Sequence, residues 1–178
     1  MEKTVEELNN QAIELASSGE YNESIECLKK AISLESSNYL LWFNLGITYR
    51  DSGSLDQAKA SLERALDLSP DNTEILDTLA VLCNNLKDTQ EAMSYCAQAL
   101  DIEPNDPHIW NTAGVIFFNK GEYNDASEAF ERAVTLNPYY YDALFNLRDT
   151  YKELGNNAGQ AECIARMKSL SKQGIYNA

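Results

Sequence analysis

Residues 42–49 read Trp-Phe-Asn-Leu-Gly-Ile-Thr-Tyr, and the rest of the chain can be aligned to this stretch. Trp42, Leu45, Gly46 and Tyr49 follow the spacing i, i+3, i+4, i+7. Residues at this spacing lie on one face of an α-helix. The stretch therefore predicts an amphipathic helix whose packed face includes a glycine, where a second helix axis can approach closely.

Equivalent positions recur every 34 residues along the chain. Alanine recurs at Ala31, Ala65, Ala99 and Ala133, and proline at Pro70, Pro104 and Pro138. Glycine recurs at Gly19, Gly53, Gly121 and Gly155, with Lys87 at the corresponding position of the third unit. Such a period is typical of repeat proteins. It divides the chain into units 5–38, 39–72, 73–106, 107–140 and a degenerate terminal unit, 141–174.

Each unit predicts two helices. We number the positions of a unit as columns 1 to 34; columns 4, 7, 8 and 11 are mostly apolar or small, as are columns 20, 24 and 27. Gly53 follows the first helix, where glycine enters the left-handed region without a steric penalty. Ser54 and Gln57 predict a capping box that opens the second helix. Asp106-Pro107 predicts a side-chain cap followed by proline at the first helical position. The fold class is therefore all-α.

Residues 42–49, the glycine after them and the later alanines and proline resemble the tetratricopeptide repeat. The family pattern is W-x-x-L-G-x-x-Y, then Gly, then A-x-x-x-F/L-x-x-A, then Pro, and it returns from Trp110 to Phe117 with Phe130, Ala133 and Pro138. The resemblance covers nearly the whole chain. It implies a right-handed α-solenoid of antiparallel helix pairs, a tetratricopeptide superhelix, as a single domain over 1–178. It says little about biological role, because this scaffold is widely reused.

In this family the first helix of each repeat lines a concave surface where ligands commonly lie. Helical geometry places columns 2, 5, 9, 12 and 13, flanked by column 6, on one stripe away from the packed columns. An apolar strip rimmed by polar groups is typical of a binding surface. The predicted peptide-binding groove comprises Asn9, Asn10, Ile13, Phe43, Asn44, Ile47, Arg50, Asp77, Val81, Asn84, Asn85, His108, Asn111, Val115, Phe118, Asn119, Phe145 and Asn146.

Two features of this stripe have alternative interpretations. The aliphatic residues of column 9 either form an exposed line or are covered by neighbouring helices. The short polar residues of column 6 either bind the backbone of an extended peptide or bridge adjacent helices. Column 6 consists of Asn10, Asn44, Thr78, Thr112 and Asn146.

The formal net charge of −14 disfavours nucleic acids and anionic membrane surfaces as partners. The stripe holds seven acidic residues against Arg50 and Lys152, which favours a protein or peptide partner with basic and apolar residues. Relatives that bind Hsp70 or Hsp90 clamp a terminal carboxylate with Lys, Arg and Asn. The corresponding residues of the first three units are Asn9, Ile13, Asn44, Glu74 and Thr78. Because Lys and Arg are missing there, we expect no carboxylate clamp.

Signals of catalysis, metal binding and export are missing from the sequence. It contains one histidine, no glycine-rich phosphate loop and no nucleophile–base motif. The four cysteines are far apart and lack C-x-x-C spacing, so we expect them to pack inside helices rather than bind metal. The N-terminus lacks the apolar stretch of a secretory signal. We expect no enzyme activity, no cofactor and a cytoplasmic location.

Three functional hypotheses follow. The first is a scaffold or adaptor that binds a partner segment in its groove. The second is a chaperone-like protein that shields hydrophobic segments of a secreted or assembling partner. The third is a self-associating scaffold, a homo-oligomer through the C-terminal helix, in which Ile164, Leu170 and Ile175 pack on a second copy. Arg148, in a column of small residues, predicts a looser final helix pair.

Overall fold

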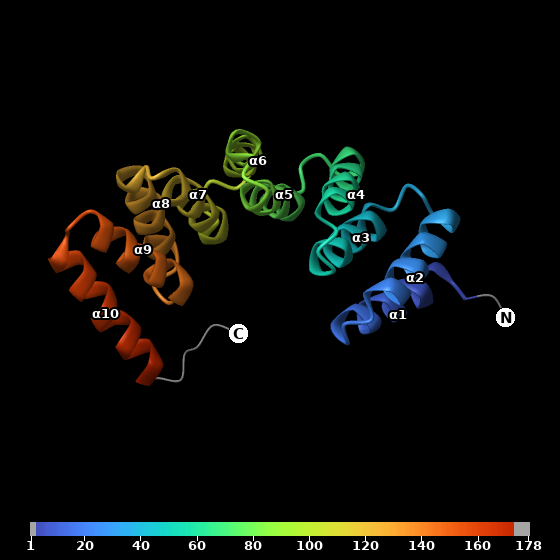
Figure 1. Cartoon of the computed structure of the whole chain (residues 1–178), viewed down its shortest axis with the longest axis horizontal. Coiled ribbons are helices and arrows are strands. Elements are labelled where there is room, and N and C mark those ends of the chain that lie inside the picture. Colours follow the sequence, from blue (N-terminus) through green and yellow to red (C-terminus); the bar gives the residue numbers. More distant parts are fainter. Residues whose placement is uncertain (1–2, 173–178) are drawn as a thin grey trace. The chain divides into compact units, whose positions relative to one another are not determined.

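In a computed structural model that describes residues 3–172, the chain forms ten helices and no strand over that range (Figure 1). Each predicted repeat contributes one pair of helices, so the prediction of an all-α solenoid of helix pairs is confirmed. The helices are α1 Val5–Ser17, α2 Tyr21–Leu34, α3 Tyr39–Asp51, α4 Leu55–Leu68, α5 Thr73–Asn85, α6 Thr89–Ile102, α7 Pro107–Lys120, α8 Tyr123–Leu136, α9 Tyr141–Glu153 and α10 Asn157–Lys172.

The chain divides into two compact units, Met1–Asp88 and Thr89–Ala178. Unit 1 contains α1 to α5 and unit 2 contains α6 to α10. The boundary falls inside the third repeat, which the 34-residue period did not predict. A single domain over 1–178 therefore stays a prediction, and each unit is described by itself below.

The turns inside the repeats use the left-handed backbone conformation, as the glycine period predicts. Gly53 has φ of +82° and Gly121 has φ of +79°. Lys87, which replaces glycine in the third repeat, has φ of +68°. A residue with a Cβ atom pays a steric penalty of about 1–2 kcal/mol in this region. The repeat geometry is thus retained even where the favourable residue is missing.

One of the two predicted caps is confirmed and the other is wrong. Asp106 accepts a hydrogen bond from the backbone N–H of His108 at 2.7 Å, and Pro107 is the first residue of α7. Ser54 makes no side-chain cap bond. Its backbone N–H donates to the carbonyl of Tyr49 at 2.8 Å, so the group that Gln57 would have bound is already engaged.

Helix pairs pack through the small residues of column 8. A Cβ atom added to Gly46 would lie 2.6 Å from Cγ of Leu62, and one added to Gly114 would lie 2.5 Å from the ring of Phe130. Because atoms in contact stay more than 3 Å apart, only glycine permits these helices to approach so closely. The predicted role of column 8 is confirmed for both pairs.

The final pair, α9 and α10, is built differently. Arg148 occupies column 8 and lies with its Cζ 3.9 Å from the centroid of the Phe145 ring. Ile164 occupies column 24, the position of Leu62 and Phe130 in earlier repeats. It is 36% exposed, whereas Leu62 and Phe130 are 0% and 1% exposed. The predicted looser packing of this pair is therefore confirmed.

The cysteines pack inside helices as expected, whereas one expectation about α10 is wrong. Cys83, Cys96 and Cys163 are buried and Cys27 is half-buried, all as free thiols. Leu170 is buried in the core of unit 2, so it cannot pack on a second copy as the third hypothesis supposed. Ile175 lies outside the described residues.

Candidate functional site

The first helices of unit 1 expose a series of aliphatic side chains. Ile13 on α1 is 50% exposed, Leu40 on α3 is 43% exposed and Val81 on α5 is 37% exposed. Ile47, the column 9 residue of α3, is half-buried. Neighbouring helices thus leave column 9 exposed on α1 and α5 and cover it partly on α3.

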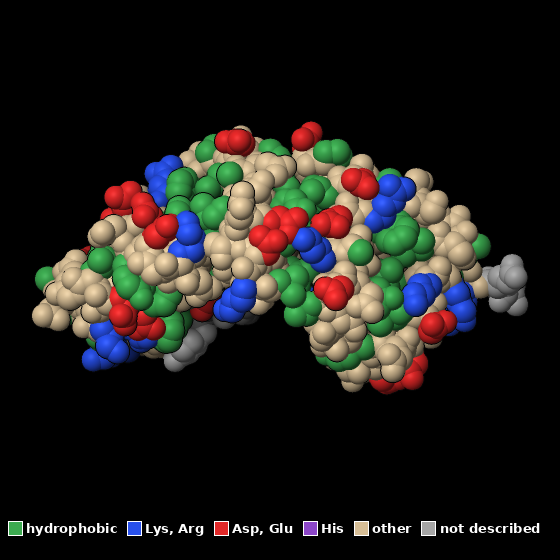
Figure 2. Space-filling view, turned by 45° about the horizontal axis from the view of Figure 1, so that its top comes forward, with side chains coloured by type: hydrophobic (Ala, Val, Ile, Leu, Met, Phe, Trp, Pro, Cys, Tyr) green, Lys and Arg blue, Asp and Glu red, His purple; other side chains and the backbone are tan. Residues whose placement is uncertain are grey.

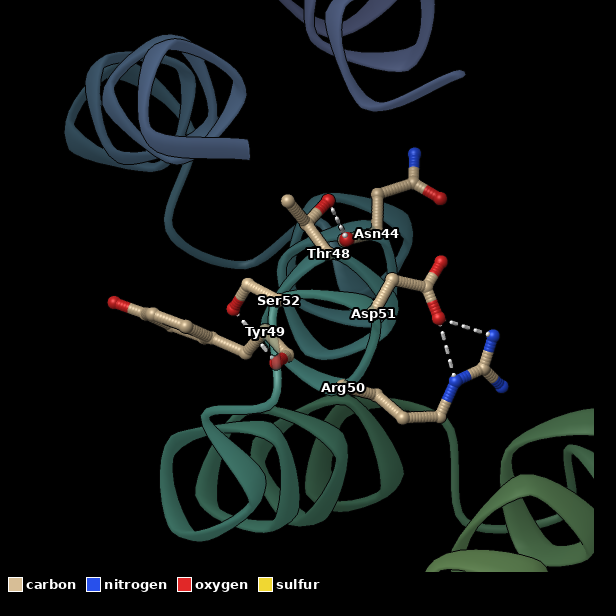
Figure 3. Close-up of polar contacts among 6 residues, drawn as sticks. All are labelled: Asn44, Thr48, Tyr49, Arg50, Asp51 and Ser52. Atoms are coloured by element: carbon tan, nitrogen blue, oxygen red, sulfur yellow. Dashed lines mark hydrogen bonds and ion pairs between the residues drawn. The ribbon is translucent and has the colours of Figure 1, made fainter. Parts of the chain in front are cut away.

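Two asparagines of column 6 bridge adjacent first helices. In unit 1, Nδ2 of Asn44 donates to Oδ1 of Asn9 at 2.8 Å, which joins α3 to α1. Figure 3 shows the Asn44 side chain leaving α3, with Oγ1 of Thr48 donating to the Asn44 carbonyl at 2.8 Å. For Asn44, the bridging interpretation is confirmed, and the peptide-ladder interpretation stays a prediction, because the amide keeps one N–H and its oxygen for a ligand.

The same arrangement recurs three repeats later, in unit 2. Nδ2 of Asn146 donates to Oδ1 of Asn111 at 3.0 Å, and Oγ1 of Thr150 donates to the Asn146 carbonyl at 2.8 Å. Both bridges share a sequence pattern. An asparagine in column 5 of one repeat precedes an asparagine in column 6 of the next, and only these two repeat junctions have that combination.

Two threonines of column 6 and one predicted groove residue do not present free side chains. Thr112 is buried, and Oγ1 of Thr78 donates to the carbonyl of Glu74 in its own helix. Asn84 is only 5% exposed, so its predicted place on the surface is wrong. Asn10, Asn85 and Asn119 are exposed as predicted.

Two arginines on or beside the stripe form ion pairs with the residue that follows them in the same helix. Nη2 of Arg50 lies 2.9 Å from Oδ1 of Asp51 (Figure 3), and Nη2 of Arg148 lies 2.7 Å from Oδ1 of Asp149. These cations are therefore compensated by the residue that follows them. On the face drawn in Figure 2, acidic side chains are interspersed with hydrophobic ones. Column 2 contributes exposed carboxylates at Glu6, Glu74 and Asp142.

Unit 2 contains a pocket of 180 Å³ along the exposed side of α7 and α9, lined by Val115, Phe118, Asn119, Phe130, Asn146 and Asp149. Half-buried Phe118 is held by an edge-on contact with Tyr123, whose ring centroid lies 5.2 Å away. The pocket combines apolar walls with amide groups and one carboxylate. Because the carboxylate of Asp149 is paired with Arg148, these groups suit an aliphatic side chain.

Two further predicted groove residues of unit 2 lie on the surface. His108 is exposed, and its Nδ1 lies 3.1 Å from the hydroxyl of Tyr140. Phe145 is exposed beneath the guanidinium of Arg148. Both rings are thus accessible but partly engaged by neighbours within their own unit.

The perturbed titratable groups have structural roles. Burial, followed by a hydrogen bond to the carboxylate of Glu131 at 2.7 Å, raises the pKa of Tyr151 above its ordinary value. Burial also raises the pKa of the Cys163 thiol. Both groups are therefore protonated near neutral pH, which makes Cys163 a poor nucleophile.

The described residues, 3–172, contain neither a metal-binding cluster nor a membrane-spanning helix. Within them, no group of three or more His, Cys, Asp or Glu side chains is placed to hold a metal ion. No helix in that range is both long and apolar enough to cross a bilayer. A cytoplasmic location stays a prediction.

Comparison with known proteins yields family and fold matches. Residues 49–116 and 107–140 match family profiles described as tetratricopeptide repeat, and residues 12–50 match one described as TPR repeat. No curated protein matches this chain.

Solved structures match over nearly the full length. MamA from residue 41 to its end, from Desulfovibrio magneticus RS-1, is 17% identical with a TM-score of 0.83, covering 97% of this chain and 98% of that one. A second MamA crystal structure is 20% identical with a TM-score of 0.80, covering 93% and 97%. BtubC from P. vanneervenii is 19% identical with a TM-score of 0.86, covering 98% and 82%. At these identities the likeness shows the fold alone.

Proposed function

This chain belongs to the tetratricopeptide repeat family, and we propose that it is an adaptor that binds a segment of a partner protein against its first helices. The family's fold supports protein–protein interaction in general. Beyond that general role, we propose which surface binds the segment and which residue types the segment contains. The proposed function includes no catalytic step.

The exposed aliphatic side chains of unit 1 carry the proposal. Ile13, Leu40 and Val81 come from three successive first helices and stand among polar neighbours. Covering them removes apolar surface from water, which contributes about 25 cal/mol per Å². Scattered exposed aliphatics are common on proteins, but aliphatics on the same stripe of three successive first helices favour a shared ligand.

Charge defines the partner segment further. Glu6 and Glu74 flank this series with exposed carboxylates, and the chain as a whole is strongly acidic. A segment with Lys or Arg beside apolar residues therefore complements the surface and avoids like-charge repulsion. In unit 2, the pocket beside Val115 and Phe118 adds apolar walls for such a segment.

A selection from displayed random linear peptides tests the proposal. Wild-type protein is expected to enrich peptides in which Leu, Ile or Phe neighbours Lys or Arg. The double variant Ile13→Lys, Val81→Lys is expected to bind the enriched peptides about tenfold or more weakly, because apolar contact is lost and like charge is introduced. These two exposed positions suit the test better than half-buried Phe43 or Phe118, where a charge would disturb packing.

The control is Ala60→Lys, which adds a cation at an exposed position of α4, the second helix of its repeat and so outside the proposed groove. Its affinity for the selected peptides is expected to match wild type. If wild type and the double variant bind the selected peptides with equal affinity and equal helicity, the proposed groove is wrong. Enrichment of purely hydrophobic peptides without basic residues would favour the chaperone hypothesis instead.

A further inference from the structure

Both units use the same columns to join one repeat to the next. In unit 1, Leu28 and Ile32 of α2 pack with Leu41 and Leu45 of α3. In unit 2, the corresponding residues of α8 and α9 form the same contact, namely Phe130, Val134, Ala143 and Leu147. Columns 24 and 28 of a second helix therefore receive columns 3 and 7 of the following first helix.

The last repeat presents these receiving columns without a following helix among the described residues. Column 24 is Ile164, which is exposed, and column 28 is Lys168. A pocket of 360 Å³ opens here, lined by Tyr141, Arg148, Ile164, Met167, Lys168, Ser171 and Lys172. Helix α10 contains Glu162 against Arg166, Lys168 and Lys172, so this surface is basic on a chain of net charge −14. We call it the C-terminal face.

The first repeat presents the inserting columns with the opposite charge. Columns 3, 7 and 10 are buried in the following repeats, but in α1 they are Glu7, Gln11 and Glu14. Both glutamates are exposed. Helix α1 contains three carboxylates and no Lys or Arg. Lys3 lies nearby and donates to Gln11. We call the surface formed by Glu7, Gln11 and Glu14 the N-terminal face.

We propose that the C-terminal face of one copy receives the N-terminal face of a second copy, so that the 34-residue register continues from chain to chain. A polar end is enough to keep a repeat array soluble, but solubility does not require ends of opposite sign. Here Lys168 occupies column 28, which adjoins column 7 within the chain. In α1, Glu7 and Glu14 lie one helical turn on either side of the column 7 residue, Gln11. Because the two faces differ, the contact is heterologous, so a dimer keeps one free face at each end to which further copies can add.

This self-association goes beyond the proposed adaptor function and uses different residues. Mass measured by light scattering and sedimentation velocity, from micromolar to near-millimolar protein, tests it. Wild type is expected to grow beyond a dimer as concentration rises. Lys168→Glu alone and Glu14→Lys alone are each expected to remain monomeric, since each places like charges across the contact.

Mixing the two variants gives the sharper test. The Lys168→Glu protein keeps a wild-type N-terminal face, and the Glu14→Lys protein keeps a wild-type C-terminal face. Their mixture is therefore expected to grow beyond a dimer with the two variants alternating, because the two wild-type faces attract each other and the two substituted faces also carry opposite charges. Both substitutions in a single chain are expected to restore growth with concentration, because the charges are then exchanged rather than lost.

The controls are Glu128→Lys on α8 and Lys29→Glu on α2, exposed mid-helix positions outside both faces, which are expected to assemble as wild type. Monomeric wild type at every concentration would overturn the proposal. So would assembly that neither face variant reduces, or a mixture of the two variants that stays monomeric.

Discussion

The helix pairs α7–α8 and α9–α10 lie in the same unit and share the repeat period, yet they pack differently. In the first pair, Gly114 allows the Phe130 ring to pack directly against the backbone of α7, and Phe130 is buried. We call this interface between the two helices of a pair the seam. In the second, Arg148 and Ile164 hold the same two columns, and Ile164 is exposed. Both pairs keep a left-handed glycine in the turn, Gly121 and Gly155. Turn chemistry and seam packing are therefore separable properties of a repeat.

Truncating the column 24 residue should give the largest difference between the two pairs. Phe130→Ala is expected to destabilise the protein by about 3–5 kcal/mol, because it leaves a cavity among buried neighbours. Ile164→Ala is expected to cost less than about 1 kcal/mol, since that side chain already meets water. Urea unfolding followed by far-UV circular dichroism measures both. Equal losses would mean that the two seams are equally packed.

Adding a methyl group in column 8 should also distinguish the pairs. Gly114→Ala is expected to cost about 1–3 kcal/mol, because the new Cβ would overlap the Phe130 ring. Arg148→Ala shortens the side chain at the same column and is expected to change stability by less than about 1 kcal/mol. The same denaturation measurement applies, and a Gly114→Ala protein as stable as wild type would contradict a tight seam.

Much of this fold could be predicted because one physical rule, helix packing at a fixed period, governs many residues at once. The helix pairs, the glycine turns and the Asp106 cap all follow from local spacing. The Ser54 capping box failed because a backbone hydrogen bond to Tyr49 competes for the same N–H group. The burial of Asn84 depends on tertiary packing that the period does not encode.

The candidate surface was harder to predict than the fold. Ile13 and Val81 are exposed whereas Ile47 in the same column is half-buried. Asn44 and Asn146 each donate to an asparagine of another helix. A column can identify the face on which a side chain lies. It does not identify which neighbouring amide that side chain will bind.

The shared turn should respond alike in both pairs. Gly121→Ala and Gly155→Ala are each expected to cost about 1–2 kcal/mol, because alanine is strained at positive φ. The opposite change, Lys87→Gly in unit 1, is expected to stabilise the protein by up to about 1 kcal/mol. Thermal melts of the three variants measure these effects. A stabilised Gly155→Ala would show that the final turn is not held left-handed.

The amide bridge between α7 and α9 couples the two pairs more weakly. Asn146→Ala is expected to cost about 0.5–1.5 kcal/mol, the usual net contribution of one hydrogen bond. A double-mutant cycle with Asn111→Ala should show that the losses are not additive. Additive losses would mean that the bond contributes nothing in solution. Asn44 and Asn9 provide the matched cycle in unit 1.

Alkaline pH should affect the final pair through Cys163 and Tyr151. Their pKa values are raised in the folded state above the ordinary 9.0 and 10.0, so the folded chain retains protons that the unfolded chain loses. Stability is therefore full below about pH 9 and falls as the pH rises further. Denaturation midpoints measured from pH ~8 to ~10.5 are expected to fall less steeply in Cys163→Ala and Tyr151→Phe. Slopes identical to wild type would contradict the shifts.

The two tryptophans occupy equivalent places in separate units. Nε1 of Trp42 donates to the Ser36 carbonyl at 2.9 Å, and Nε1 of Trp110 donates to the Pro104 carbonyl at 2.9 Å. Each indole is thus tied to the loop that enters its own repeat. With either indole replaced by phenylalanine, the remaining fluorophore reports on one half of the chain. Emission spectra of the two single-tryptophan proteins can then reveal whether the halves melt together or in sequence.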